Sequence, residues 1–126
     1  MDNITLCRRF FTALETNDLA TAKDLCAETF AGSQNGGPAM NLDTLMQFTG
    51  AVHTVVPDFR YENTVCTATD SGFVEEHDVC GTLPDGSTFK LVLCVVADVT
   101  DGKITALREY VDTGAAAGLL KALRPG

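Results

Sequence analysis

The segment TDGKITALREYVD, residues 100–112, decides the fold of this chain. Its Asp101-Gly102 pair is typical of a tight turn. The residues that follow alternate between apolar and polar, which predicts a strand over 103–112. Because side chains alternate along a strand, Leu107 and Glu109 share one face. A carboxylate placed among apolar neighbours is the feature of this segment that points to chemistry.

The same alternation runs back from this segment through the second half of the chain. It predicts strands over 59–68, 73–83 and 89–99, joined by short Gly-containing turns into antiparallel hairpins. The first half has apolar residues at helical spacing instead. Helices and strands kept to separate halves of the chain predict the α+β class, in one domain over 1–126.

The expected elements of the first half follow from capping residues and chain breakers. They are a helix capped by Asn3, a second capped by Asp18, a short extended piece at Phe30, a loop over 32–38, and a third helix from Asn41 or Asp43 to Pro57. A short terminal helix is expected over 115–123.

Composition limits the possible partners. A net charge of −8 repels a phosphate backbone, so nucleic acid is not expected as a partner. The longest apolar run, 91–97, is too short to cross a bilayer, and the N-terminus lacks the features of a signal peptide. We expect a soluble, cytoplasmic protein with no membrane partner.

No metal and no cofactor are expected. The five cysteines fit no zinc-binding spacing and are interpreted as reduced thiols of the core. The two histidines, His53 and His77, are too far apart in sequence to offer a ligand spacing. His53 is interpreted as a residue near the end of the third helix.

The strand over 89–99 is apolar on both faces. Leu91 and Leu93 alternate with Val92 and Cys94, so both faces need cover. A second subunit packed sheet to sheet would supply it, and we predict a homodimer. The alternative is that this strand is central and that the terminal helix covers its outer face.

Taken together, the helices, the Pro57-Asp58 pair after the third of them and the long antiparallel meander resemble the nuclear transport factor 2-like superfamily. The segment 100–112 is similar to the "dGKI…wRdYfD" signature of SnoaL-like polyketide cyclases and limonene-epoxide-hydrolase-like enzymes. The resemblance implies a cone-shaped α+β barrel in which N-terminal helices pack on a curved, mostly antiparallel sheet around a pocket.

The resemblance also implies catalytic residues. The acid that follows the Arg of the signature is catalytic in these families, and Glu109 holds that position. Residues 74–78 align with an "ER-x-D" segment of the epoxide hydrolases, which makes Asp78 the second acid. Glu76 takes the place of the Arg that bridges the two acids in that family. The Tyr and Asn that hold the attacking water there have no convincing counterparts here.

A group of acids in an apolar pocket divides into proton donors and acceptors, because burial favours the neutral form. We therefore expect a cofactor-independent acid–base enzyme with Asp78, Glu109 and Glu76 as its catalytic residues. Epoxide hydrolysis, or cyclisation or isomerisation of a polyketide- or terpenoid-like molecule, fits this chemistry. The expected substrate is small, hydrophobic and neutral or cationic. The expected pocket is lined by Leu42, Leu45, Met46, Leu91, Leu93, Leu107 and Val111.

Several alternatives stay open at the level of sequence. Alternation along the strand over 73–83 is also satisfied if Glu75 and His77 face inward, whereas inward acids at 76 and 78 place His77 on the surface or at the dimer interface. Glu109 could instead be a structural partner of Arg108 or Arg60, and Arg60 could supply a cation to the acids. The whole domain could bind a small ligand without catalysis, or be a structural dimer with a vestigial pocket.

Overall fold

A five-stranded sheet organises the molecule, a computed structural model that describes residues 1–124. The strands lie in the order β1-β5-β4-β3-β2, with β1 parallel to β5 and all other neighbours antiparallel. Their bounds are Cys26–Gln34 (β1), Arg60–Ala68 (β2), Gly72–Thr82 (β3), Thr88–Thr100 (β4) and Lys103–Val111 (β5). The end of the predicted domain, residue 126, lies outside the described residues.

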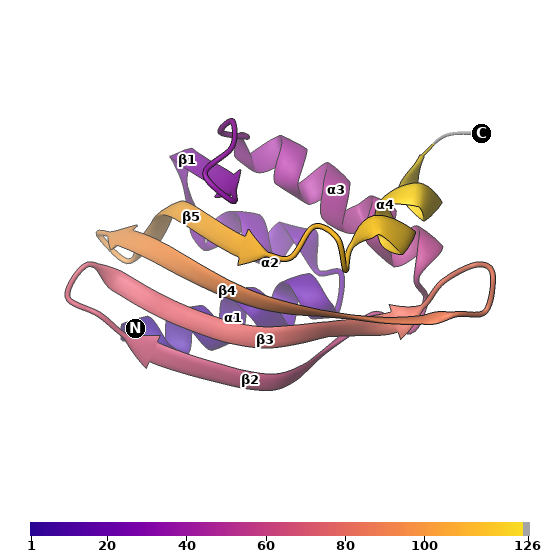
Figure 1. The fold of residues 1–126 in the computed structure, drawn as a ribbon. Helices are drawn as coiled ribbons and strands as arrows, with labels where there is room; N and C mark the ends of the chain where they lie inside the picture. Colours follow the sequence, from indigo (N-terminus) through magenta and orange to yellow (C-terminus); the bar gives the residue numbers. More distant parts are fainter. Residues whose placement is uncertain (125–126) are drawn as a thin grey trace.

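The helices cover one face of this sheet. In Figure 1 α1 (Asn3–Glu15) and α2 (Leu19–Asp24) lie behind the strands, α3 (Leu42–Val55) lies above them in the view, and α4 (Ala117–Leu123) lies beside α3 at one end. Each longer helix starts at a side-chain cap: Asp2 Oδ1 accepts a hydrogen bond from the Thr5 N–H at 2.7 Å, and Asn41 Oδ1 accepts one from the Thr44 N–H at 2.9 Å.

The predicted α+β class is therefore confirmed, and the predicted strands match β2 to β5 closely. Two details differ. The first cap is Asp2 rather than Asn3. The extended piece at Phe30 is part of a nine-residue strand, β1, which pairs with β5 and occupies the start of the expected loop. The sheet is open, with β1 and β2 as its edges, so it does not close into a barrel.

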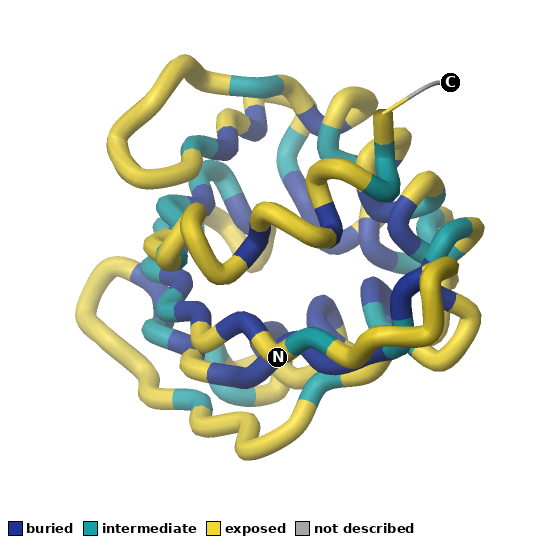
Figure 2. The backbone as a smooth tube through the Cα atoms, turned by 45° about the vertical axis from the view of Figure 1, so that its right-hand side comes forward, coloured by how far each residue is buried: buried dark blue, intermediate teal, exposed yellow. Residues whose placement is uncertain are grey.

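The core lies between the helices and the inner face of the sheet. Phe10 and Phe11 of α1 are buried there, and Phe11 packs edge to face on Phe73 of β3 with ring centroids 6.3 Å apart. Figure 2 shows buried stretches on the strands and helices and exposed hairpin loops. Aromatic burial of this kind dominates core energetics, so the α1–β3 contact fixes which face of β3 is inward.

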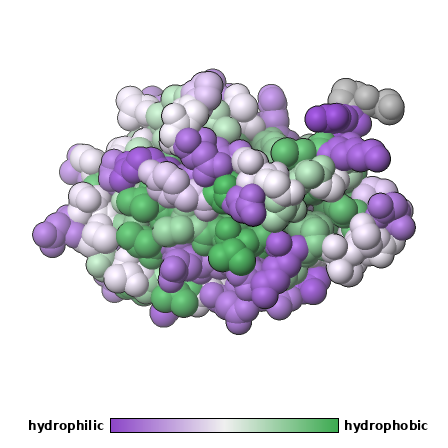
Figure 3. Space-filling view, in the orientation of Figure 1, coloured by the Kyte–Doolittle hydropathy of each residue, from purple (hydrophilic) through white to green (hydrophobic). Residues whose placement is uncertain are grey.

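The outer face of the sheet carries exposed apolar residues. Val92 on β4 is 67% exposed, and Val65 on β2 and Tyr110 on β5 are also exposed. In Figure 3, which looks onto this face, hydrophobic patches lie over the strands between charged groups. The terminal helix α4 packs against α3 instead of covering this face. The terminal helix therefore does not cover the outer face, and the alternative that it would do so is wrong.

Candidate active site

A cavity of about 160 Å³ opens between the inner face of the sheet and the helices. Its wall is almost entirely apolar, with aromatic rings from α1, α3 and β2 and aliphatic chains from β4, β5 and α4. Few polar side chains reach it, and those that bear on chemistry are Gln34, Tyr61, His77 and Glu109. A mostly apolar hollow with a few convergent polar groups is the usual form of a small-molecule site.

Glu109 is presented to the cavity by the parallel pairing of β1 with β5. Gln34, the last residue of β1, lies opposite Glu109, and its Nε2 donates a hydrogen bond of 2.7 Å to Glu109 Oε2. Asn35 then turns the chain at φ 51° and binds the backbone N–H and C=O of Val111 through its side-chain amide. These contacts pin Gln34 and Glu109 together at the end of the parallel pair.

Burial raises the pKa of the Glu109 carboxyl above its ordinary value. The hydrogen bond from Gln34 and the nearby His77 act in the opposite direction without cancelling that effect. A carboxyl group with a raised pKa exchanges its proton closer to neutral pH, which is the property that a general acid or base needs.

His77 enters the cavity from β3, held from behind by a buried acid. Its Nδ1 lies 2.5 Å from Oε1 of Glu75, and the two side chains are 2% and 0% exposed. The other carboxylate oxygen of Glu75, Oε2, has no hydrogen-bond partner among the described residues. Glu75 is therefore hidden behind His77, and only the imidazole reaches the cavity.

Aromatic rings pack around the His77 imidazole. The Tyr61 ring lies at 4.1 Å between centroids and is tilted by 31°, and the Phe11 ring lies at 5.3 Å, edge to face. Both rings belong to elements that pack on β3, namely β2 and α1. The imidazole is thus held by packing as well as by Glu75, which limits its rotation.

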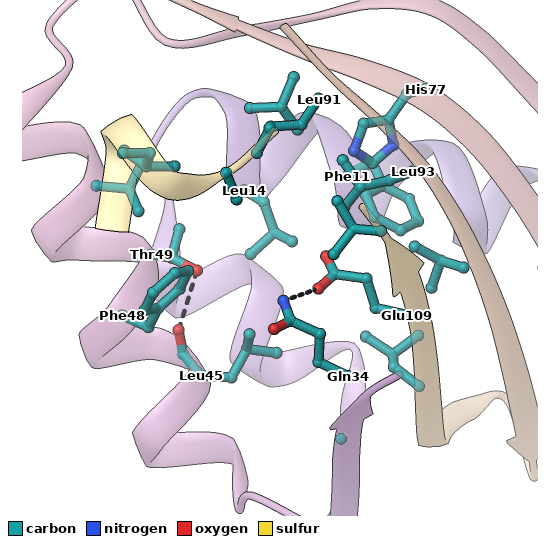
Figure 4. A pocket seen from close by; sticks show the side chains of 18 of the residues that line it. Phe11, Leu14, Gln34, Leu45, Phe48, Thr49, His77, Leu91, Leu93 and Glu109 are labelled. Atoms are coloured by element: carbon teal, nitrogen blue, oxygen red, sulfur yellow. Dashed lines mark hydrogen bonds between the residues drawn. The ribbon is translucent and has the colours of Figure 1, made fainter. Parts of the chain in front are cut away.

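The strand register places these groups in rows across the sheet. Glu75 lies opposite Val95 of β4, and Val95 lies opposite Glu109 of β5. The next row holds His77, Leu93 and Val111. Strands are about 4.8 Å apart, so the backbones of β3 and β5 are separated by roughly 10 Å. His77 and Glu109 therefore project into the same hollow from two strands that flank β4 (Figure 4).

The expected inward position of Glu76 and Asp78 is wrong. Glu76 is exposed, and Asp78 lies on the outer face, where its Oδ2 accepts a hydrogen bond from Asn63 Nδ2 at 2.8 Å and pairs with Lys90 Nζ at 3.3 Å. The hydrogen bond from Asn63, together with Lys90, holds the pKa of Asp78 below its ordinary value. Asp78 is thus a largely covered, ion-paired carboxylate on the face away from Glu109.

The burial of Phe73 explains the facing of β3. Residues two apart share a face, so an inward Phe73 turns Glu75, His77 and Val79 inward as well. The other set starts with the smaller Val74, which leaves less apolar volume for the core. A match to an acidic motif at residues 76–78 does not indicate which face of the strand is inward. Because of this facing, His77, which was expected at the surface or dimer interface, lines the cavity instead.

The apolar lining is largely as expected. Leu45, Leu91, Leu93, Leu107 and Val111 line the cavity. Leu42 and Met46 do not; both belong to the core cluster behind the wall. Sequence reasoning missed Gln34, which fell in the expected loop, and Tyr61, whose role depends on strand register. No short-range pattern marks either residue.

The remaining charged and metal-binding candidates lie elsewhere. Arg108 pairs with Asp98 at 2.9 Å on the outer face, and Arg60 pairs with Glu62 at 2.7 Å, so neither is the partner of Glu109. His53 Nε2 lies 2.7 Å from the carbonyl oxygen of Leu14, a structural contact. Within residues 1–124, no three potential metal ligands gather in one place, and no helix is long and apolar enough to cross a bilayer.

Solved structures of other proteins share this fold. A protein named as a polyketide cyclase from Xanthomonas campestris pv. campestris superposes with a TM-score of 0.79 at 21% identity, over 98% of this chain and 100% of that one. An LEH-like epoxide hydrolase from M. tuberculosis gives 0.74 at 19% identity, over 96% and 88%. A protein named as an isomerase from Bacillus subtilis gives 0.76 at 14% identity, over 95% and 93%.

These identities are low, so the three likenesses establish the fold and leave the reaction to be argued from the site. The family assignment comes from the sequence itself. The profile of the SnoaL-like domain matches residues 7–107, which include most of α1, both members of the Glu75–His77 pair and the first half of β5. The chain belongs to the SnoaL-like domain family of the nuclear transport factor 2-like superfamily.

Proposed function

We propose that the protein is a cofactor-independent acid–base enzyme that moves a proton on a small hydrophobic molecule, in an isomerisation or cyclisation. One observation carries the proposal: Glu109 stands in an apolar cavity with a raised pKa and faces the same hollow as His77. A carboxylate base and a second proton-handling group on two strands of the same apolar wall suit proton abstraction next to a carbonyl group.

Glu109 is the base in this proposal. Its ionised form takes a proton from the carbon next to the substrate carbonyl, and the electron pair moves to the carbonyl oxygen to form an enolate. Returning the proton to another carbon gives isomerisation, and attack of the enolate carbon on a second carbonyl gives cyclisation. Gln34 holds the carboxylate in place by its hydrogen bond to Oε2, which leaves Oε1 for the substrate.

Cavity size and lining set the substrate class. A cavity of about 160 Å³ compares with the 150 Å³ apolar cavities that bind benzene. We therefore propose a compact substrate of about one ring, neutral or cationic, polyketide-like or terpenoid-like in its carbon skeleton. An anionic ligand would meet the carboxylate of Glu109 at close range, with no Arg or Lys among the described residues that line the cavity.

The test needs no natural substrate. Cyclohexanone in D₂O loses its α-protons to exchange, and the rate is read by proton NMR with and without enzyme. We expect the wild type to accelerate exchange and Glu109→Gln to lower that rate by about 10²–10⁴-fold. Glu76→Gln, which changes an exposed carboxylate on the outer face, is the control and retains the wild-type rate. Equal rates for wild type and Glu109→Gln would remove Glu109 from the mechanism.

A second candidate is a binding module without turnover. The nearly continuous apolar wall favours it, because ligand burial alone needs no acid or base. In that case cyclohexanone binds, with chemical-shift changes at the cavity residues, but its α-protons exchange at the rate of the buffer. The same experiment therefore separates the two candidates.

We also propose a homodimer formed through the outer face of the sheet. The exposed Val65, Val92 and Tyr110 support it, since they leave an apolar surface on the face of the sheet that none of the described helices covers. Analytical ultracentrifugation should give a mass near twice 13.4 kDa, and Val92→Lys should lower it to that of one chain. A wild type that sediments as a monomer would refute the dimer.

A further inference from the structure

We infer that Glu75 and His77 hold one proton between them, and that the pair thereby keeps an N–H donor at Nε2 of His77 facing the cavity. The role of this donor in catalysis rests on the proposed function, but its existence does not. This N–H would donate a hydrogen bond to an oxygen atom of the ligand. The expected ligand is therefore a neutral molecule that carries a carbonyl, hydroxyl or similar acceptor oxygen.

Both side chains of the pair are deeply buried. Glu75 is fully buried, and its Oε2 has no hydrogen-bond partner within residues 1–124. An ionised carboxylate beside a neutral imidazole would leave a net negative charge in this site with half of its acceptor capacity unused. Burial of an uncompensated charge is strongly unfavourable, so the site favours a pair with no net charge.

The surroundings of the pair supply no cation among the described residues. The titratable groups around it are Cys7 of α1, Tyr61 and Cys66 of β2, Glu109 of β5 and Asp78, which interacts with His77 from the outer face. None of these five groups carries a positive charge. Neutrality of the pair must therefore come from a proton of its own.

The position of that proton determines the state of Nε2. A hydrogen on Glu75 Oε2 would find no acceptor among the described residues, so the proton belongs to the contact with His77. With no net charge the pair is then either a carboxylate with an imidazolium or a carboxylic acid with a neutral imidazole. The two forms differ only in the position of the proton along the 2.5 Å contact between Glu75 Oε1 and His77 Nδ1. Nε2 carries a hydrogen in both forms. The conclusion therefore does not depend on which side of the contact the proton occupies.

Nε2 of His77 has access to the cavity. His77 lines the cavity, and Nε2 makes no hydrogen bond to any residue that the structure describes. Within the described residues, Glu75 Oε2 is the one fully buried side-chain atom without a hydrogen-bond partner. Nε2 of His77 does not share that property, so it is not sealed off from the cavity. Nε2 is therefore free to donate to a ligand. In the proposed reaction it stabilises the enolate oxygen while Glu109 holds the abstracted proton.

The experiment is nitrogen NMR of ¹⁵N-histidine-labelled protein at pH 7, with His77→Phe used to assign the His77 signals against those of His53. We expect Nε2 of His77 to be protonated in the wild type and in the control Glu76→Gln. In Glu75→Gln the amide oxygen accepts the Nδ1 hydrogen bond without supplying a proton, so Nε2 should become bare.

An unprotonated Nε2 in the wild type would overturn the inference. This wild-type measurement decides even if Glu75→Gln fails to fold. A protonated Nε2 in a folded Glu75→Gln would show that Glu75 is not its cause and would overturn it equally. Neither outcome depends on turnover, so failure here is distinct from failure of the proposed function in the exchange assay.

Two isosteric ligands test the oxygen acceptor. Cyclohexanone and methylenecyclohexane differ in C=O against C=CH₂, and binding of each is measured by NMR titration. His77→Phe should weaken cyclohexanone binding roughly 3- to 10-fold relative to methylenecyclohexane, the value of one hydrogen bond. Equal effects on both ligands, or no binding of either to the wild type, would contradict the assignment.

Discussion

Neighbouring acidic residues on the two faces of β3 differ sharply in their burial. Glu75 is fully buried against His77 behind the cavity, whereas Glu76 is exposed on the outer face. Asp78, also on the outer face, is paired with Asn63 and Lys90 and has a lowered pKa, whereas Glu109, inside the cavity, has a raised one. Adjacent positions of one strand thus place one acid in solvent and the next in the buried interior.

The comparison teaches that an acidic motif identifies a candidate site only after the facing of its strand is known. The inner face combines an apolar wall with few polar groups, and burial there raises the pKa of Glu109. On the outer face the hydrogen bond from Asn63, together with Lys90, lowers the pKa of Asp78. Substitutions at matched positions on the two faces should therefore have very different effects.

The largest contrast is expected between Glu75→Ala and Glu76→Ala. Removing Glu75 leaves His77 buried without its partner, and breaking a buried pair costs about 3–5 kcal/mol of unfolding free energy. Removing Glu76 should change the stability by less than about 0.5 kcal/mol. Urea denaturation at pH 7 measures both. Similar losses for the two variants would contradict the described facing of β3.

The next effect is the pH dependence of catalysis. Glu109 acts as a base only when ionised, and its pKa is raised by burial, so the exchange rate should increase with pH through a midpoint above 4.5. The cyclohexanone assay between pH 3 and 8 gives this midpoint. A rate that is flat or that falls across the range would indicate that Glu109 is not the base.

A smaller effect is expected from Glu109→Gln on stability. Since the pKa of Glu109 is raised in the folded state, its ionisation destabilises the fold at neutral pH, and this penalty disappears as the pH falls below about 4.5. Replacing the carboxylate by an amide should therefore raise the melting temperature at pH 7 by roughly 3 °C. Scanning calorimetry at pH 7 and pH 4 tests both the gain and its loss. A lower melting temperature at pH 7 would argue against a buried, strained carboxylate.

The smallest effect is expected from Asp78→Asn. The pKa of Asp78 is lowered in the folded state, so its stabilising contribution is present at neutral pH and is lost as the pH falls through the folded value, below 3.8. Asp78→Asn should thus lower stability slightly at pH 7 and leave it unchanged near pH 2. The exchange rate should stay at the wild-type level, and a large loss of activity would return Asp78 to the mechanism.

Most of the fold follows from local patterns. Alternation over residues 59–112 and the turns within it predict the meander, and capping residues such as Asp18 and Asn41 predict the helix starts. The strand β1 was not predicted at its full length, because its pairing with β5 is parallel and joins residues far apart in the sequence. Contacts of that kind leave no local signal.

The site was predictable only in part. Glu109 is marked by its apolar neighbours on β5 and does face the cavity, while its catalytic role remains a proposal. The assignment of β3 failed because Val74 and Phe73 both satisfy a period of two, and only the packing of Phe73 against Phe11 decides between them. The contribution of Gln34 depends on the β1–β5 register, which no residue pattern records.

Carbon NMR of ¹³C-labelled side-chain carboxyl groups gives the decisive measurement, because one pH titration reports on both faces of the sheet. We expect the pKa of Glu109 to lie above 4.5 and that of Asp78 below 3.8 in the folded protein. If Glu109 instead titrates at or below 4.5, its carboxylate is in water, and the proposed chemistry of the cavity is contradicted.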